Sequence, residues 1–341
     1  MANINDVAER ANVSITTVSH VINQTRYVSD DLTERVRKAM EELDYHPNSL
    51  ARGLRSGKTK TIGLVIPDIS NQFFAEISRK IEDKGYENGY SVILCNTDDD
   101  PYKEKNYIDV LLAKKVEGII FISAGVESNY LEKTIEFNIP IVVVDRDIKE
   151  NDYDIVLVDN SVGGFDATRY LIELGHRRIA CIAGPSPITP SAQRVAGYKQ
   201  ALQEAGIQID TNLIIPGDFH YESGDRAMRA LLALPQPPTA VFACNDMMAL
   251  GAFQAVNNQG MKIPEDISVI GFDNIPFSQT VYPMLTTMAQ PIHEMADLVV
   301  DLLVDKIKFH RQRVRTNERE LNYKRIVLET KLIKRNSCRA I

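Results

Sequence analysis

Polar and aromatic side chains recur just after short apolar runs along this chain of 341 residues. Asp145 and Arg146 follow the run 139–144, for example, and Asn245 follows the run 240–243. If the runs are parallel strands, these side chains gather beyond the carboxyl ends of the strands, where open sheets bind ligands. Ten positions share this placement and comprise two carboxylates, two guanidiniums, three amides and three aromatic rings: Asn71, Phe73, Phe74, Asp145, Arg146, Arg194, Phe219, Asn245, Asp273 and Gln290.

The types of these ten side chains suit a neutral ligand that is rich in hydroxyl groups. Each hydroxyl both donates and accepts, so carboxylates, arginines and amides can bind it through paired hydrogen bonds. The apolar C–H face of a sugar ring can pack against the aromatic rings. A single aspartate at a strand end often only caps the next helix, so the prediction of a sugar site depends on the whole set.

Catalytic chemistry is less well supported by the same residues. Asp145 and Asp273 could imitate the carboxylate pair of a glycosidase. The six histidines and four cysteines, however, lack the spacing of metal ligands or redox pairs. Gly57-Lys58-Thr59 ends like a phosphate-binding loop, but Arg52 stands where that motif requires glycine. We expect no catalytic residue, no metal site and no cofactor.

Alternating strands and helices are expected to position the ten residues. Val- and Ile-rich runs indicate strands that are covered on both faces, at 62–66, 91–95, 118–122, 139–144, 155–158, 179–183, 240–243 and 267–271. Amphipathic spacing predicts helices at 73–88, 103–114, 162–174, 193–205 and 247–259. This alternation predicts an α/β fold with parallel sheets and helices on both faces. Because the repeats exceed what one open sheet holds, we expect two doubly wound lobes with a cleft between them.

The first 46 residues follow an all-helical pattern instead. Helices are predicted at 4–11 and 15–23, with a tight turn at Asn12 and a capping hydroxyl at Ser14. Two short helices in this arrangement form a helix-turn-helix, whose second helix enters the major groove of DNA. The exposed positions there would be Ile15, Thr16, Ser19 and His20. A generic three-helix bundle has the same pattern, so the pattern alone leaves both possibilities open.

The net charge and the lack of recognisable targeting signals exclude some classes of protein. The net charge of −7 argues against a protein that coats nucleic acid or membranes through bulk charge. Residues 1–60 carry nine Lys/Arg against eight Asp/Glu, which leaves −8 for the remainder. No apolar run approaches a membrane span, and no secretory signal is recognisable, so we expect a cytoplasmic protein. A sugar transport protein would share the cleft, but it needs such a signal and has no use for residues 1–60.

Several motifs resemble the LacI/GalR family of bacterial transcriptional repressors. The matching segments are Asp6-Val7-Ala8, Ala11-Asn12-Val13-Ser14, the stretch 17–23, Pro47-Asn48 and Ala51-Arg52-Gly53-Leu54. The resemblance continues through most of the chain, to about Ser337. It implies a helix-turn-helix domain at 1–46, a hinge helix and linker at 47–60, and an effector-binding and dimerisation domain at 61–341. Within that domain the chain would cross between the lobes near 160 and 290–325.

The resemblance also implies how DNA is read. Ile15, Thr16 and His20 would face base edges in the major groove, and Arg26 would touch the backbone or flanking bases. Leu54 would enter the minor groove as an apolar wedge that kinks the duplex. The full set that the resemblance assigns to DNA is Ser14, Ile15, Thr16, Thr17, Ser19, His20, Asn23, Arg26, Ser49, Ala51, Arg52, Leu54 and Arg55.

The ten strand-end residues are similar to the pocket of periplasmic ribose-binding proteins, whose lineage ribose repressors share. This implies a small neutral sugar, with Asp145 and Arg146 on adjacent hydroxyls and Arg194 and Asn245 on the ring-oxygen side. The expected function is a homodimeric repressor of a sugar-utilisation operon, released by that sugar from a pseudo-palindromic operator in double-stranded DNA.

Three points stay open at the level of sequence. A purine-like corepressor, a phosphorylated metabolite or a partner protein could replace the sugar as the controlling signal. The exact sugar and the sign of its effect are also undecided. The basic segment 308–325 is expected to be a solvated loop that precedes a strand at 326–333.

Overall fold

The computed structural model describes residues 2–23, 26–46, 59–122, 131, 134, 137–145, 153–185, 189–316 and 323–341. Contacts divide the chain into two units, residues 1–59 and residues 60–341, which are taken one at a time below. Over the described ranges, no helix combines the length and the apolar character that crossing a membrane requires.

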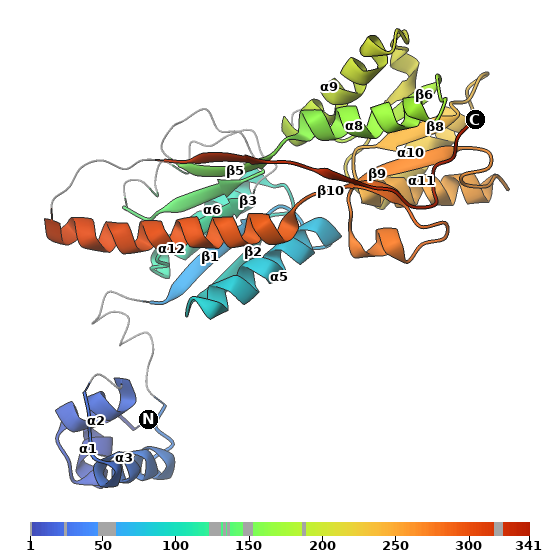
Figure 1. The fold of residues 1–341 in the computed structure, drawn as a ribbon. Helices are drawn as coiled ribbons and strands as arrows, with labels where there is room; N and C mark the ends of the chain where they lie inside the picture. The colour runs from blue at the N-terminus through green and yellow to red at the C-terminus, as the bar shows by residue number, and fades with distance from the viewer. Residues whose placement is uncertain are drawn as a thin grey trace. The chain divides into compact units, whose positions relative to one another are not determined.

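Over its described residues, the first unit is a three-helix module (Figure 1). It comprises α1 (Ile4–Ala11), α2 (Ile15–Asn23) and α3 (Asp30–Glu42). The Asn3 side chain caps α1, and left-handed Asn12 at φ 49° ends it. The predicted helices at 4–11 and 15–23 are confirmed. A small apolar core holds the three helices together, formed by Val7, Ala8, Ala11, Val18, Val36 and Ala39.

The second unit contains two six-stranded sheets, one in each lobe. The N-lobe sheet has the order β11-β5-β4-β3-β1-β2, with β1 (Thr61–Ile66), β2 (Ser91–Asn96), β3 (Ile119–Ile122), β4 (Ile141–Val144), β5 (Asp154–Val158) and β11 (Arg325–Leu328). The C-lobe sheet has the order β12-β10-β9-β8-β6-β7, with β6 (Ile179–Ala183), β7 (Ile214–Pro216), β8 (Ala240–Ala243), β9 (Ser268–Asp273), β10 (Thr286–Ala289) and β12 (Lys331–Ile333). All strand pairs are parallel except β10 with β12. The predicted α/β fold of two lobes is confirmed.

Helices cover the sheets because the strands are apolar on both faces. In the N lobe, α5 (Gln72–Glu87) and α12 (Ile292–Thr316) pack on one face, and α6 (Pro101–Ala113) packs on the other. In the C lobe the helices form two close pairs, α8 with α9 and α10 with α11 (Figure 1). Their bounds, with those of two 3-10 turns, are α8 (Asn160–Glu173), α9 (Thr189–Glu204), α10 (Tyr221–Leu232), α11 (Asp246–Asn258), η1 (Thr211–Leu213) and η2 (Pro276–Gln279).

The described chain passes between the lobes at three places. It leaves the N lobe after β5 to begin α8, returns through Gln290 into α12, and leaves again between β11 and β12. The predicted single strand 326–333 is therefore wrong, because its two halves belong to different sheets. The predicted loop 308–325 is also wrong in its first part, because α12 continues to Thr316.

Candidate functional site

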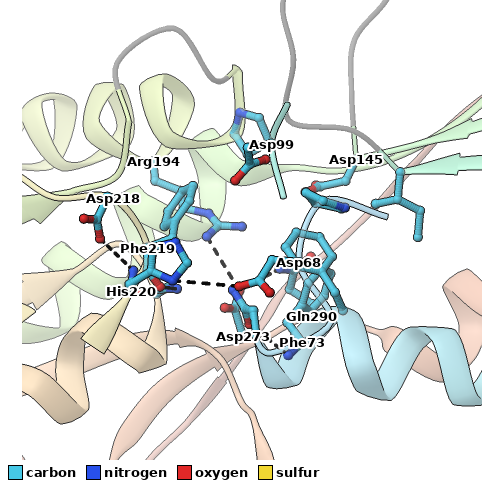
Figure 2. A pocket seen from close by; sticks show the side chains of 16 residues that line it. Asp68, Phe73, Asp99, Asp145, Arg194, Asp218, Phe219, His220, Asp273 and Gln290 are labelled. Atoms are coloured by element: carbon cyan, nitrogen blue, oxygen red, sulfur yellow. Dashed lines mark hydrogen bonds and ion pairs between the residues drawn. The ribbon is translucent and has the colours of Figure 1, made fainter. Parts of the chain in front are cut away.

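Nine of the ten predicted strand-end residues line one pocket between the two lobes (Figure 2). The tenth, Arg146, lies outside the described residues. The space between the lining residues is about 640 Å³, a figure that includes the solvent at the open mouth. The N lobe contributes Asn71, Phe73, Phe74 and Asp145; the C lobe contributes Arg194, Phe219, Asn245 and Asp273; Gln290 comes from the crossing into α12.

Local backbone geometry explains how several of these side chains reach the pocket. Asn71 Oδ1 accepts a hydrogen bond from Phe73 N at 3.0 Å, and this cap begins α5 directly after β1. Asn245 caps α11 in the same way, at 2.9 Å from Met248 N, and its Nδ2 donates to the Phe219 carbonyl. Asp145, Phe219 and Asp273 each have positive φ, of 58°, 69° and 112°. Such backbone strain concentrates at functional sites, where the surrounding fold enforces it.

Arg194 is held rigidly at the centre of the pocket. It is 3% exposed, its Nε donates to Asn160 Oδ1 at 2.8 Å, and its Nη1 donates to the Cys244 carbonyl at 2.6 Å. Nη1 also lies 3.6 Å from Asp273 Oδ1. The guanidinium carbon lies 3.8 Å from the centroid of the Phe272 ring, which adds a cation–π contact. The orientation of the cation is thus fixed by the protein alone.

Two buried carboxyl groups in the pocket have raised pKa values. Burial raises the pKa of Asp273 to about 7, although Arg194 and a 2.7 Å hydrogen bond donated by Gln290 Nε2 oppose the shift. Burial likewise raises the pKa of Asp145 to about 6, against Arg194 and a hydrogen bond from Asn160. Both carboxyls therefore change charge close to neutral pH.

The pocket also holds two buried acceptor atoms that lack a donor. Asp145 Oδ1 and Gln290 Oε1 are inaccessible, and neither has a hydrogen-bond partner in the described part of the chain. Unpaired buried acceptors are rare in folded proteins, because their desolvation is not compensated. Both residues line the pocket, and a hydroxyl donor that reached either atom would satisfy it.

Aromatic rings supply the apolar walls of the pocket. Phe73 and Phe74 meet edge to face, with ring centroids 5.2 Å apart. The Phe219 ring lies against Gly184, where an added Cβ would be only 2.3 Å from the ring. Only glycine leaves room for this ring position. The walls and the polar groups together match a ring that has apolar faces and a hydroxylated edge.

Sequence reasoning missed several side chains at the pocket. Asp68, Asp99, Asp218 and His220 also line it, and Asn160 orients Arg194. Each of the first three lies two or three residues beyond a strand, and Asn160 lies two residues beyond β5. The rule that located the ten residues reaches these four as well, because it included Asn71, which lies five residues beyond β1. His220 is the neighbour of Phe219 in the same loop.

The helix-turn-helix residues of the first unit lie on and around α2. Ser14 Oγ accepts a hydrogen bond from Thr17 N at 3.1 Å, which caps the helix. Ile15 and Thr16 are exposed in its first turn, while Ser19 and His20 are half-buried one turn later. Asn23 Nδ2 donates to the Ser19 carbonyl at 2.8 Å, and Arg26 is exposed. The remaining positions predicted to contact DNA, namely Ser49, Ala51, Arg52, Leu54 and Arg55, lie outside the described residues.

Both units match known family models. Residues 3–48 match bacterial regulatory proteins of the lacI family. Residues 59–334 match the periplasmic binding proteins and sugar binding domain of the LacI family. The chain belongs to the LacI family. It is a DNA-binding transcriptional repressor of that family, whose members are regulators rather than enzymes, and the resemblance seen in the sequence is confirmed.

Curated relatives of this LacI-family chain cover nearly all of it. The transcriptional regulator DegA of Bacillus subtilis is 42% identical over 98% of this chain and 97% of its own. The repressor PurR of Edwardsiella ictaluri is 41% identical over 93% and 94%. The ribose operon repressor of Escherichia coli is 40% identical over 90% and 93%. The relatives thus share the architecture, while their names point to different signals.

Solved structures of the family agree with the fold. The lac repressor dimer bound to operator and an anti-inducer superposes with a TM-score of 0.86, at 28% identity over 99% of both chains. A LacI-family regulator of Enterococcus faecium with bound ribose superposes with a TM-score of 0.73, at 33% identity over 82% of this chain and 99% of its own.

Proposed function

We propose that this LacI-family repressor controls a sugar-utilisation operon and leaves its operator when a small neutral sugar, such as ribose, occupies the pocket. The observation that carries this proposal is the pair of unpartnered buried acceptors, Asp145 Oδ1 and Gln290 Oε1, beside a fixed arginine and aromatic walls. Sugar hydroxyls supply the missing donors and accept from Arg194. The ring faces pack on Phe73 and Phe219. A related regulator of the family holds ribose in its crystal structure, which supports this choice of ligand class.

The roles of individual residues follow from this proposal. Asp145, with Arg146 beside it in sequence, binds adjacent hydroxyls, and Arg194 and Asn245 hold the ring-oxygen side. On the DNA side, Ile15, Thr16 and His20 read base edges in the major groove. The linker residues Ser49, Ala51, Arg52, Leu54 and Arg55 act at the centre of the operator, with Leu54 as the minor-groove wedge.

The protein is proposed to act as a cytoplasmic homodimer. Two identical helix-turn-helix modules then read two half-sites, so the operator is a pseudo-palindrome. The relative that was solved on operator is itself a dimer. Sedimentation velocity of the purified chain tests this part: one species at twice the mass of 38.3 kDa is expected, and a monomer at micromolar concentration would contradict it.

A corepressor is the second candidate signal. Purine repressors are about as similar in sequence to this chain as ribose repressors are, so overall similarity does not separate the two. A corepressor would tighten DNA binding rather than release it. The sign of the response therefore distinguishes the two candidates without any need to know the ligand beforehand.

Fluorescence anisotropy of a labelled operator fragment tests the proposed function. The full chain is titrated at fixed salt, because phosphate contacts make affinity steeply salt-dependent. Ribose, other pentoses, hexoses, purines and sugar phosphates are then added in turn. Release by one free sugar is expected, and Asp273→Ala should abolish it while leaving operator affinity intact. Tighter binding with a purine, or no response to any free sugar, would overturn the sugar-inducer proposal.

A further inference from the structure

Three aspartates and a histidine line the pocket at its mouth, and both lobes contribute to them (Figure 2). Asp68 and Asp99 follow β1 and β2 of the N lobe, whereas Asp218 and His220 follow β7 of the C lobe. We call these four residues the mouth cluster. Asp99 and His220 are exposed, while Arg194 and Asp273 deeper in the same pocket are buried.

The members of the mouth cluster interact across the gap between the lobes. Asp68 Oδ2 lies 3.8 Å from His220 Nδ1, and Asp218 Oδ1 accepts a hydrogen bond from His220 N at 2.9 Å. Although Asp99 is exposed, neighbouring protein atoms partly desolvate it and raise its pKa; the charge of Asp68 raises the pKa further, while His220 opposes this. The carboxylates of Asp68 and Asp99 are thus close enough to interact electrostatically.

The described lining of the pocket carries an excess of negative groups. Five carboxyls face it, from Asp68, Asp99, Asp145, Asp218 and Asp273, against the guanidinium of Arg194 and the imidazole of His220. Arg194 is already engaged by Asn160, the Cys244 carbonyl and Asp273. His220 is already paired with Asp68. Arg146 lies outside the described residues.

The helix N-termini at the pocket offer no substitute for a cationic phosphate site. A free helix N-terminus binds phosphate through its unpaired N–H groups. At α5 the Asn71 side chain accepts the hydrogen bond of Phe73 N, and at α11 the Asn245 side chain accepts that of Met248 N. A phosphate monoester carries a charge of about −1.5 to −2 at neutral pH. In this pocket it would meet carboxylates at the mouth without a dedicated set of donors inside.

We propose that Asp68, Asp99 and Asp218 form an anionic collar that admits neutral sugars and rejects their phosphate esters. The inference rests on the proposed function, since it names the charge class that the same pocket selects. The collar makes the repressor respond to the free sugar before phosphorylation and not to the phosphorylated product. His220 holds the two sides of the collar together through Asp68 and the Asp218 loop.

Isothermal titration calorimetry on the DNA-free full chain tests the collar. Ribose and ribose 5-phosphate are titrated into the wild type, Asp99→Asn and the double variant Asp68→Asn/Asp99→Asn, and the readout is the ratio of the two dissociation constants. For the wild type we expect ribose 5-phosphate to bind roughly a hundredfold more weakly than ribose. Each neutralised carboxylate should lower this ratio about fivefold, because it removes a repulsion that acts on a phosphate carrying nearly two negative charges. The exposed Glu265→Gln removes one charge away from the pocket and should leave the ratio unchanged.

The outcomes separate the collar from the proposed function. Ribose binding with a ratio that stays the same in the variants overturns the collar alone. If ribose 5-phosphate binds the wild type as tightly as ribose does, the collar is also overturned. Absence of binding by every free sugar of the anisotropy screen overturns the proposed function and the collar with it. Asp99→Asn keeps the test decisive if the double variant does not fold, because the Asp99 side chain is exposed.

Discussion

The Asp273 carboxyl is buried beside Arg194 and Gln290, and burial raises its pKa to about 7. In the unfolded chain this carboxyl titrates near 4. Between these two values the folded protein binds a proton that the unfolded chain has lost, so the free energy of unfolding falls as the pH rises. From pH 5 to pH 8 this one group should remove about 2–3 kcal/mol from the stability of the ligand-free protein.

Replacing the titrating group checks this pH dependence. Asp273→Asn should flatten the decline in unfolding free energy between pH 5 and pH 8, measured by urea denaturation without ligand. Asp225→Asn, on the surface of α10 beside Arg229, serves as the control and should keep the wild-type slope. An equally steep decline in Asp273→Asn would show that the carboxyl is not the source.

Residue types and strand ends were enough to locate most of the candidate site. Nine predicted residues line the pocket because parallel strands all end at one edge of their sheet, which is a property of the fold class. Asp99 and His220 escaped because they follow strands of different lobes, three residues beyond β2 and four residues beyond β7. Their closeness depends on how the lobes face each other, and no periodicity in the sequence encodes that arrangement.

At the scale of elements, the helix pair α8–α9 depends on glycine where the backbones cross. A Cβ added at Gly164 would lie 2.2 Å from the carbonyl oxygen of Arg194, and one at Gly197 would lie 2.1 Å from that of Ser161. These contacts involve backbone atoms, which cannot rotate away. The position of Arg194 in the pocket thus depends on a close approach of two helices.

Gly164→Ala should therefore push α9 away and displace the Arg194 guanidinium. We expect a loss of about 2 kcal/mol in unfolding free energy, typical of overpacking, and at least tenfold weaker sugar binding by calorimetry. Gly85→Ala is the matched control, since the nearest atom to its added Cβ is a methyl group of Val92 at 3.2 Å. Normal sugar affinity in Gly164→Ala would contradict this account of how Arg194 is positioned.

The cap of α2 offers a second test at this scale. Ser14 Oγ accepts a hydrogen bond from Thr17 N, whereas Ser29 begins α3 without a side-chain cap. Ser14→Ala should destabilise the first turn of α2 by about 1 kcal/mol. Hydrogen exchange of the α2 amides in the full chain should accelerate about fivefold. Ser29→Ala should leave exchange in α3 unchanged, and equal effects of the two substitutions would contradict the role of the cap.

Element prediction failed where sequence pattern carries no information about partners. The apolar pattern of 326–333 predicts extended chain, which is what β11 and β12 both are. The pattern does not indicate that the chain passes from one sheet to the other at Glu329 and Thr330. Similarly, the basic charge at 308–316 was interpreted as a loop, although charged side chains are compatible with a solvated helix face.

At the scale of the whole protein, Glu117 links three distant parts of the second unit. One of its carboxylate oxygens accepts from Lys60 N at 2.7 Å, and the other pairs with Arg311 near the far end of α12. Glu117→Gln should leave the sugar dissociation constant within twofold of the wild type. The sugar concentration that releases half of the operator should shift by at least threefold in anisotropy titrations. An unchanged release curve would show that this contact has no part in regulation.

The helix α12 begins two residues beyond Gln290, whose side chain binds Asp273 at the pocket, and Arg311 follows almost twenty residues later (Figure 1). At 1.5 Å per residue, these two ends are about 30 Å apart. A helix of this length is a lever arm: tilting it by about 3° at the pocket end moves the other end by about 1.5 Å. Displacements of this size are the ones that separate allosteric states at helix interfaces. Lys60, where the chain enters the second unit, is joined through Glu117 to Arg311 at this end of the helix, so a tilt of α12 would reach it through two contacts.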